Sequence, residues 1–286
     1  MILSHARLPV PTLPREARPD TDYTSGKVNQ LTKKLTTEFL SSRSQGTSKH
    51  TIAFYQRCLS KAIGAELSPQ GINSFLDSLS CGNAKHRYYR AIRAFCNWVE
   101  REGYSNPTKR VDAPKVQRKL LPSVSTEQLQ ALLDATDNLR DRAIISLLFD
   151  GGLRLSEICS TETDDIHWSS NTLRVIVKGN REAKAAFTPG TATLLREHIA
   201  TNRHNSLFRM KPRGVQDMLS RLAVATGIKC NAHSFRRGFA CNLHKKGLSA
   251  LSIMHLGRWS SLDIVTHCTK SITFDDCLEL YKKVNS

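Results

Sequence analysis

Apolar side chains recur every three or four residues along most of this chain, and this spacing is the strongest constraint on its fold. The period begins near residue 26 and continues to residue 284, broken by glycine- and proline-marked turns. Leu173 to Val177 (LRVIV) differs, because it is a short continuous apolar run followed by the turn residues Gly179-Asn180. With Glu182 to Phe187 as the returning strand, the pattern predicts a mainly α-helical protein with one small β-sheet.

The first hundred residues divide into an arm and a helical domain. Residues 1–25 contain four prolines and little apolar period, which predicts a flexible arm. Residues 26–106 show four helical stripes, and Ser68-Pro69 is a typical start of the third helix. One side of the fourth helix is basic, which predicts a DNA-binding face, with an ordinary solvated face as the alternative. The basic residues on that side are Lys85, Arg87, Arg90 and Arg93.

A second domain is expected after a basic linker. Residues 107–122 lie between prolines and are poor in acidic side chains, so we expect an extended segment able to follow a phosphate backbone. Ser125 and Gln128 have capping-box spacing at the start of the next helix. Residues 123–286 then form a mainly helical domain, in which Gly151-Gly152 ends one helix and Arg154 begins another.

The charge favours a polyanionic partner. The chain carries a formal net charge of +17, with 15 basic and 6 acidic residues over 26–117, and 24 and 16 over 118–286. Both halves are therefore basic, as expected for DNA held from two sides. A merely cationic protein or a membrane-surface binder is the alternative.

The cysteines and the lengths of the apolar segments indicate the cellular compartment. Eight cysteines without a CxxC pair favour reduced thiols and a cytoplasmic protein. A DNA partner would place that protein at the nucleoid. No run of 18 apolar residues occurs, and the first twenty residues are too rich in proline for a secretory signal.

Four short motifs follow one another in the second half of the chain. They are Gly152 to Ile158 (GLRLSEI), Val177-Lys178-Gly179-Asn180, His233 to Arg236 (HSFR) and Leu256 to Ser261 (LGRWSS), followed by His267-Cys268. Together with their spacing, they resemble the tyrosine recombinases (phage integrase family), especially the Xer-like and transposon integrases. The resemblance implies a four-helix, SAM-like core-binding domain followed by a catalytic domain. It also implies a C-terminal helix, residues 273–284, that is exchanged between neighbouring copies.

The chemistry implied by this family is cleavage of a DNA phosphodiester without metal or cofactor. Such a reaction needs neutralised non-bridging oxygens, a nucleophile and a proton for the leaving 5′-oxygen. Arg154 and Arg236 are the expected phosphate ligands, because a planar guanidinium binds two oxygens at once. Arg237 points elsewhere on the helix and is expected at the DNA backbone or in solvent.

Three further positions complete the expected site. Lys178 matches the family's general acid on a hairpin, with Lys184 as its rival. His233 lies one helical turn before Arg236 and is expected to bind the phosphate or accept the nucleophile's proton; a capping or core histidine is the alternative. Trp259 lies where the family has His or Trp, and its indole can donate a hydrogen bond.

Cys268 lies where the family has its nucleophilic tyrosine. A thiol is about 3–4 Å shorter than a phenol, which is comparable with a near-attack distance. Tyr281 is a less favoured displaced nucleophile. A zinc site among Cys230, His233, His255, His267 and Cys268 is a weak competitor, because adjacent residues on a helix diverge.

These expectations define three alternative functions. The first is a site-specific recombinase that acts on an inverted-repeat site of a mobile element or chromosome, as a homotetramer on double-stranded DNA. The second is a catalytically inactive DNA-binding protein of the same fold. The third is a general basic nucleic-acid binder, whose binding depends steeply on salt without preferring any site.

Overall fold

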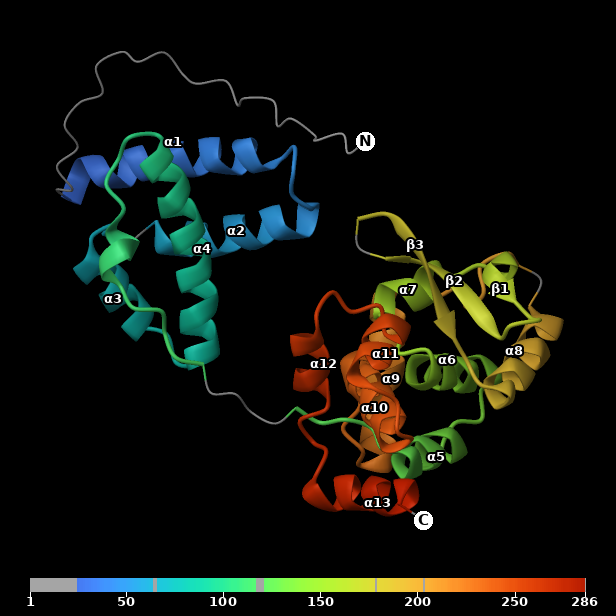
Figure 1. Ribbon diagram of the computed structural model, residues 1–286. Helices are drawn as coiled ribbons and strands as arrows, with labels where there is room; N and C mark the ends of the chain where they lie inside the picture. The colour runs from blue at the N-terminus through green and yellow to red at the C-terminus, as the bar shows by residue number, and fades with distance from the viewer. Residues whose placement is uncertain (1–24, 64–65, 117–120, 178, 203, 286) are drawn as a thin grey trace, which may run out of the picture. The chain divides into compact units, whose positions relative to one another are not determined.

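A computed structural model describes residues 25–63, 66–116, 121–177, 179–202 and 204–285, with side chains from residue 33 onward (Figure 1). The predicted arm and Lys178 therefore lie outside the described residues, apart from residue 25. The chain divides into two compact units, residues 1–118 and 119–286. Among the described residues, no helix has both the length and the apolar character needed to cross a bilayer.

The first unit is built from four α-helices and one short 3₁₀ helix. Phe39, Ile72, Ile92 and Phe95 are fully buried between the α-helices, as the apolar stripes predicted. Ser68 caps α3 by accepting a hydrogen bond from the Gly71 amide, with proline at the first helical position. The elements are α1 (Ser25–Arg43), α2 (Lys49–Ala62), α3 (Pro69–Asp77), α4 (Gly82–Arg101) and η1 (Pro107–Arg110).

The beginning of the expected linker is folded rather than extended. Residues 107–110 form η1, and the side chain of Asn106 accepts hydrogen bonds from the amide and hydroxyl of Thr108. Val111 is buried against the first unit, and its carbonyl oxygen accepts a hydrogen bond from the Tyr89 hydroxyl. A proline at the first position of a short helix and one buried apolar side chain keep this segment folded against the first unit. The basic, proline-containing composition of the segment did not predict either feature.

The second unit is mainly helical, with the three strands at one side and α12 and α13 away from them (Figure 1). The predicted capping box at Ser125 and Gln128 is confirmed. The helices are α5 (Thr126–Asp134), α6 (Leu139–Asp150), α7 (Leu155–Ser160), η2 (Thr163–Asp165), α8 (Pro189–Thr201), α9 (Pro212–Thr226), α10 (Ala232–Lys245), α11 (Ala250–Leu256), α12 (Leu262–Cys268) and α13 (Phe274–Val284).

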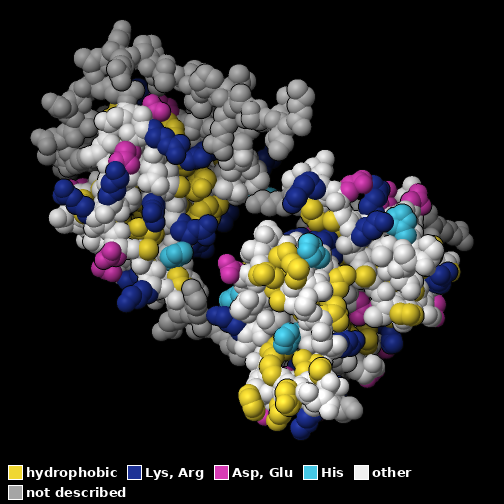
Figure 2. All heavy atoms as spheres, viewed as in Figure 1, with side chains coloured by type: hydrophobic (Ala, Val, Ile, Leu, Met, Phe, Trp, Pro, Cys, Tyr) yellow, Lys and Arg dark blue, Asp and Glu magenta, His cyan; other side chains and the backbone are white. Residues whose placement is uncertain are grey.

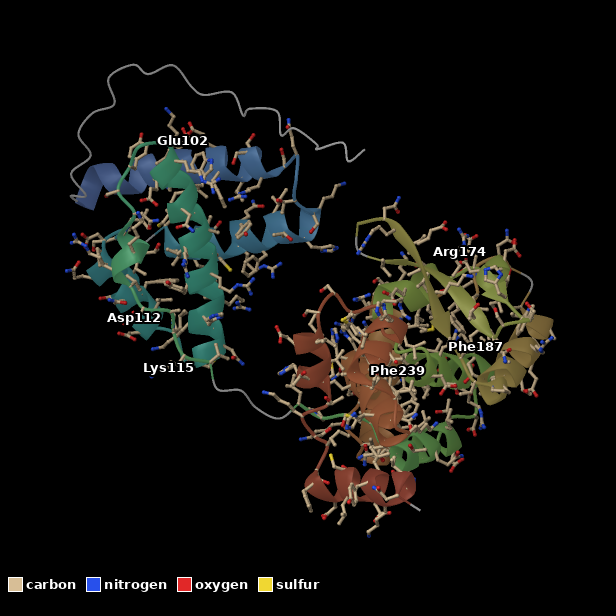
Figure 3. The ribbon with its side chains drawn as sticks, viewed as in Figure 1. Glu102, Asp112, Lys115, Arg174, Phe187 and Phe239 are labelled. Atoms are coloured by element: carbon tan, nitrogen blue, oxygen red, sulfur yellow. The ribbon has the colours of Figure 1, made fainter. Side chains whose placement is uncertain are left out.

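The predicted hairpin is confirmed as β2 (Thr172–Val177) and β3 (Arg181–Ala186), paired antiparallel with Leu173 opposite Ala185. A two-residue strand, β1 (Ile166–His167), adds a third strand beside β2 that the sequence pattern did not reveal. Arg174, labelled in Figure 3, pairs with Asp165 and Glu182 on the exposed side of the sheet. The hairpin turn at residues 179–180 projects from the helical part of the unit.

Helix α6 forms the centre of this unit. Residues 143–149 are all buried, so this part of the helix is enclosed on every side and packs against α5, α7, α8 and α10. Its C-terminus therefore has a fixed position, and the chain that leaves it is the turn containing Gly151, Gly152 and Arg154.

Candidate active site

The turn between α6 and α7 places Arg154. Gly152 has a φ of +53°, and a Cβ atom there would lie 2.6 Å from Cδ1 of Phe239, so backbone conformation and space both require glycine. Arg154 is the N-cap residue of α7, and its Nη1 donates to Oε1 of Glu157 at 2.6 Å. The Arg154 amide donates to Oε2 of the same carboxylate at 2.9 Å. Glu157 thus fixes both the backbone and the guanidinium of Arg154.

Helix α10 brings Arg236 to the same turn. The side chain of Asn231 caps this helix by accepting from the amides of His233 and Ser234. Arg236 is buried and donates hydrogen bonds to the carbonyl oxygens of Gly152 and Gly257. It therefore lies between the turn before Arg154 and the segment that joins α11 to α12.

That joining segment supplies Trp259. Trp259 is 9% exposed, and its ring centroid lies 4.3 Å from the guanidinium carbon of Arg236, as a cation–π pair. Phe239 packs against the same ring, with 6.1 Å between the ring centroids, and Figure 3 labels Phe239 on its helix inside the unit. The tryptophan thus supports the arginine from one side.

Two further charged residues belong to this cluster, Arg258 and Glu157, and neither was among the predicted site residues. The Arg258 side chain is 6% exposed, and its Nη2 lies 3.3 Å from Oε2 of Glu157, which is itself 1% exposed. Arg258 has a φ of +56° and is one of four described non-glycine residues in the left-handed region. The spacing of Arg154 and Glu157 could have indicated a cap, whereas no sequence signal marks the direction of the Arg258 side chain.

Burial and like charges shape the protonation equilibria of this cluster. Burial, followed by the charges of Arg154 and Arg258, lowers the pKa of the Arg236 guanidinium to about 9. Burial also lowers the pKa of Arg258, opposed by Glu157. For Glu157, burial would raise the pKa, but hydrogen bonds and the charges of Arg258 and Arg154 outweigh it and the pKa is lowered. Near neutral pH the cluster therefore holds three cations and one anion.

His233 lies in the first turn of α10, on the exposed surface near these arginines. Desolvation, followed by the charges of Arg237, Arg236 and Arg154, lowers its pKa. It is therefore a neutral imidazole at neutral pH, which can accept a proton or donate one hydrogen bond.

Cys268 is the last residue of α12 and is half-buried beside the cluster of Phe239 and Trp259. Burial raises its pKa, although the charges of Arg236 and Arg237 oppose this effect. Its carbonyl oxygen accepts a weak hydrogen bond from Sγ of Cys241 at 3.4 Å. The group at this position is therefore mainly a neutral thiol, within electrostatic range of Arg236.

The remaining predicted residues are placed as follows. Lys178 lies outside the described residues. Lys184 is on β3 and exposed, and its carbonyl oxygen accepts from Nη1 of Arg258 at 3.4 Å. Arg237 is half-buried, and its Nε donates to the carbonyl oxygen of Pro122 at 2.7 Å. At least one of its donors is therefore used within the protein.

The basic face of the first unit is on α4. Arg87, Arg90 and Arg93 are exposed on this helix, as predicted, and the guanidinium of Arg87 lies over the ring of Tyr88. Lys85 is half-buried and pairs with Asp77 at 2.9 Å. Three arginines are thus presented to solvent along one helix.

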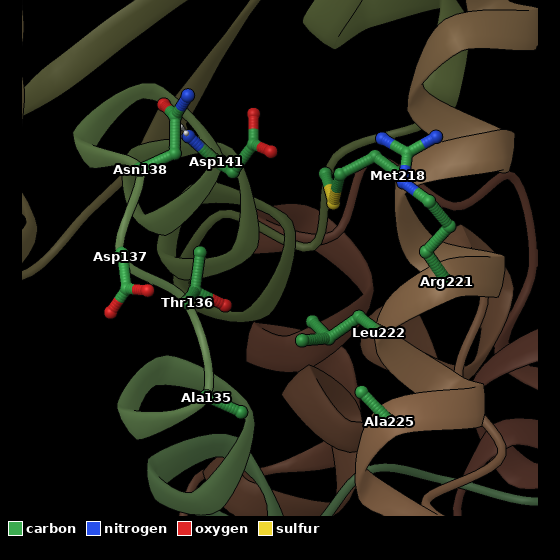
Figure 4. Close-up of a pocket in the computed structure, with 9 residues that line it drawn as sticks. All are labelled: Ala135, Thr136, Asp137, Asn138, Asp141, Met218, Arg221, Leu222 and Ala225. Carbon is green, nitrogen blue, oxygen red and sulfur yellow. Dashed lines mark hydrogen bonds between the residues drawn. The ribbon is translucent and has the colours of Figure 1, made fainter.

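One pocket in the described part of the chain lies away from this site. The pocket in Figure 4, about 300 Å³, lies between α9 and the N-terminal end of α6, whereas the Arg154 turn follows the C-terminal end of α6. Among the described residues, no three His, Cys, Asp or Glu side chains are grouped so that they could hold a metal ion.

The arrangement is suited to binding a phosphate group. Arg154 keeps about a third of its side chain exposed, and Arg236 and His233 approach it from α10. Guanidinium groups supply paired N–H donors and a permanent charge, which are the requirements for stabilising an anionic phosphorane.

Comparisons with known proteins identify the family of this chain. The model of the phage integrase family matches residues 122–272. Tyrosine recombinase XerA of Saccharolobus solfataricus is 32% identical over 70% of this chain and 67% of its own length. XerA of Pyrococcus horikoshii is 29% identical over 80% of this chain and 86% of its own length.

Solved structures show the same fold. A lambda integrase tetramer bound to a Holliday junction superposes with a TM-score of 0.73 at 14% identity, covering 85% of this chain and 79% of that one. The Tn1549 transposon integrase in complex with a circular intermediate DNA gives a TM-score of 0.70 at 14% identity, covering 88% and 99%. Since the family model spans more than half of the sequence and the XerA relatives extend the match, this chain belongs to the phage integrase family of tyrosine recombinases.

Proposed function

We propose that this chain is a site-specific DNA recombinase, or integrase, that holds one phosphate of a duplex between Arg154 and Arg236. The observation that carries the proposal is the meeting of two guanidiniums, from α7 and α10, at the single turn of Gly152. Relatives across most of the chain are named as tyrosine recombinases, which supports the same reaction class.

In this proposal each residue has a separate role. Arg154 and Arg236 neutralise the charge that develops on the non-bridging oxygens. Trp259 donates its indole N–H to the phosphate, and neutral His233 accepts the proton of the nucleophile. Lys178 gives a proton to the leaving 5′-oxygen from the β2–β3 turn. The product is a covalent 3′-phosphoprotein, which keeps the energy of the broken bond for rejoining.

Cys268 favours a second candidate function, a DNA-binding protein that does not cut. Its raised pKa makes the attacking thiolate scarce, and the thiol is about 3–4 Å shorter than a phenol. Either property slows attack on phosphorus. The phosphate site and the nucleophile are therefore to be tested separately.

We propose double-stranded DNA and further copies of this chain as the partners. Arg87, Arg90 and Arg93 on α4 contact DNA phosphates in this proposal. Helix α13 is donated to a neighbouring copy, because Phe274, Tyr281 and Val284 are 78%, 67% and 83% exposed. Figure 2 shows hydrophobic side chains gathered where Figure 1 places α13. The lambda integrase tetramer bound to a Holliday junction supports the presence of several copies on DNA, and the donation of α13 is part of our proposal.

The first experiment identifies a DNA site and the second tests cleavage. The full chain selects duplexes from a randomised pool, and the recovered inverted repeat is nicked near its centre to make a suicide substrate. A failure to select any sequence would indicate a general basic nucleic-acid binder. The suicide substrate is then incubated with the native chain, Cys268→Tyr and Cys268→Phe, and covalent adducts are separated by denaturing electrophoresis.

We expect an adduct from Cys268→Tyr and none from Cys268→Phe, which has the same bulk without a hydroxyl group. An adduct from the native chain identifies it as a recombinase, whereas tight binding without an adduct identifies the inactive DNA-binding protein. If Cys268→Tyr binds the selected site and never nicks it, the assignment of Arg154, Lys178, His233, Arg236 and Trp259 is wrong.

A further inference from the structure

Arg258 occupies an unusual place in the second unit. It lies between α11 and α12 with a φ of +56°, a backbone conformation that side chains with a Cβ rarely adopt. Its amide donates to the carbonyl oxygen of His255, so the conformation is built into the end of α11. The consequence is that its side chain points into the protein, where 6% of it is exposed.

The guanidinium of Arg258 joins segments that are far apart in the sequence. Nη2 donates to the carbonyl oxygens of Gly151 at 3.0 Å and Gly152 at 3.3 Å, which belong to the turn before Arg154. Nη1 donates to the carbonyl oxygens of Leu256 at 2.9 Å and Lys184 at 3.4 Å. One side chain thus connects α11, the α6–α7 turn and strand β3.

Arg258 also reaches Arg154 by two routes. Its Nη2 lies 3.3 Å from Oε2 of Glu157, while Oε1 of the same carboxylate accepts from Arg154 Nη1. In the opposite direction, Nη2 of Arg154 donates to the carbonyl oxygen of Arg258 at 3.3 Å. Glu157 is therefore shared by two arginines, and each arginine helps to fix the other.

We propose that Arg258 is a positioning residue of the phosphate site, fastening the turn that carries Arg154 to the segment that carries Trp259. This inference rests on the proposed function, because it concerns the same site. Four of its acceptors are backbone carbonyls and the fifth is Glu157, so Arg258 acts through Arg154 and Trp259 rather than by touching DNA. Lysine cannot replace it, since one ammonium cannot span carbonyls on both sides of the group.

The first test reads the position of Trp259 directly. The chain contains three tryptophans, Trp98, Trp168 and Trp259, so the indole region of a ¹⁵N–¹H spectrum of the full chain has three signals. Each is assigned by its Trp→Phe variant. We expect Arg258→Lys and Arg258→Gln to move the Trp259 signal and to leave the other two unchanged.

Arg209→Gln is the matched control, because Arg209 is also an arginine in the left-handed region, with a φ of +49°, and is exposed. It is expected to move none of the three signals. A Trp259 signal that is unchanged in Arg258→Gln overturns the proposal. Movement of all three signals in either Arg258 variant also overturns it, because Arg258 then supports the whole fold rather than this site.

The second test is a double-mutant cycle in the Cys268→Tyr chain, using the site selected by the chain itself. We expect Arg258→Lys to bind that duplex within about threefold of its parent and to form adduct about 10²-fold more slowly, the scale of a displaced catalytic contact. Because Arg258 acts partly through Arg154, the rate loss of the double variant with Arg154→Ala is smaller than the product of the two single losses. The proposal is overturned if the two substitutions slow adduct formation independently. It is also overturned if Arg258→Lys forms adduct as fast as its parent. If Cys268→Tyr itself never forms adduct, the proposed function fails, while the indole spectra still decide the role of Arg258.

Discussion

At the scale of single residues, the chemistry of this protein depends on how charges are buried together. Glu157 is the only acidic side chain in hydrogen-bonding contact with Arg154 and Arg258 in the described part of the chain. Burying several guanidiniums beside one carboxylate is unfavourable unless their donors have acceptors. Backbone carbonyls supply most of these acceptors, and only Nε of Arg258 among the described buried donors of the cluster has no partner.

Replacing Glu157 by glutamine should destabilise the fold by about 3–5 kcal/mol, because it leaves the buried Arg258 without its counter-ion and removes that of the partly exposed Arg154. The folded-state pKa of Glu157 is lowered, so its contribution is complete above the ordinary value of 4.5 and is lost as the pH falls through the folded value. Denaturant unfolding of the native chain should therefore weaken below about pH 4.5, and Glu157→Gln should lack this part of the dependence. Glu279→Gln, in an exposed pair with Lys282, should change stability by less than about 0.5 kcal/mol.

His233 should titrate below the ordinary pH range of histidine, since desolvation and three nearby arginines disfavour its charged form. Removing one charge in Arg237→Gln should move the midpoint upward. Histidine ring signals followed by NMR against pH provide the measurement, and each signal is assigned by its His→Gln variant. A His233 midpoint at or above the usual value would show that the imidazole is not surrounded by these cations.

At the scale of elements, the caps and turns at the ends of helices position the residues of the site. Arg154 follows a glycine turn at the end of α6, Arg236 follows the Asn231 cap of α10, and Trp259 follows the end of α11. Caps and glycine turns set the direction in which a chain leaves a helix. The functional side chains are therefore placed by buried helices rather than by long loops.

Gly152→Ala should cost more stability than Gly227→Ala, although both glycines have a positive φ. Alanine at Gly227 meets open space, so only the backbone penalty of about 1 kcal/mol applies. At Gly152 the new methyl group also collides with the Phe239 ring, and the Arg154 turn has to move. If denaturant unfolding shows the same decrease in the free energy of unfolding for both variants, the Phe239 ring moves aside without an energetic cost.

Helix α13 should matter for assembly rather than for folding. Phe274→Ser and Tyr281→Ser remove exposed apolar side chains, so the thermal unfolding temperature of the free chain should stay within a few degrees of the native value. On the selected DNA site, sedimentation should show fewer copies per duplex. Glu279→Gln on the same helix is the control, and unchanged assembly of the serine variants would exclude α13 as the contact between copies.

Element-level prediction from the sequence was accurate where a local rule decides the outcome. The Ser68 and Ser125 caps, the hairpin of β2 and β3 and the inward face of α4 each follow from a few neighbouring residues. β1 and η1 were missed because two or four residues carry no period. Arg258 was missed for another reason: a positive φ at a non-glycine residue arises from tertiary contacts, which a motif does not encode.

At the scale of the whole molecule, positive charge occurs in both units. The described surface of the first unit presents arginines along α4, and the second unit gathers them at the candidate site. The net charge of +17 attracts DNA over a distance, whereas the selection of a particular sequence depends on close contacts.

Binding of the selected duplex should weaken strongly as salt rises. Each phosphate contact that is lost should reduce the slope of log affinity against log salt by about 0.9. Arg87→Gln, Arg90→Gln and Arg93→Gln combined should therefore lower the slope by roughly 2–3. Arg213→Gln, which removes an exposed arginine paired with Asp217, is the control. An unchanged slope in the triple variant would remove α4 from the proposed interface.

The carbonyl oxygen of Gly152 accepts from Arg236 and from Arg258, and that of Gly257 accepts a second donor of Arg236. In the proposed function, these oxygens occupy donors that would otherwise bind the oxygens of a phosphate. A small free anion would have to displace them with little else to gain, whereas a duplex held along its length brings many other contacts to the exchange. If the site binds a DNA phosphate as proposed, inorganic phosphate should therefore compete only weakly with the selected duplex, because it gains too few contacts to displace these carbonyl oxygens.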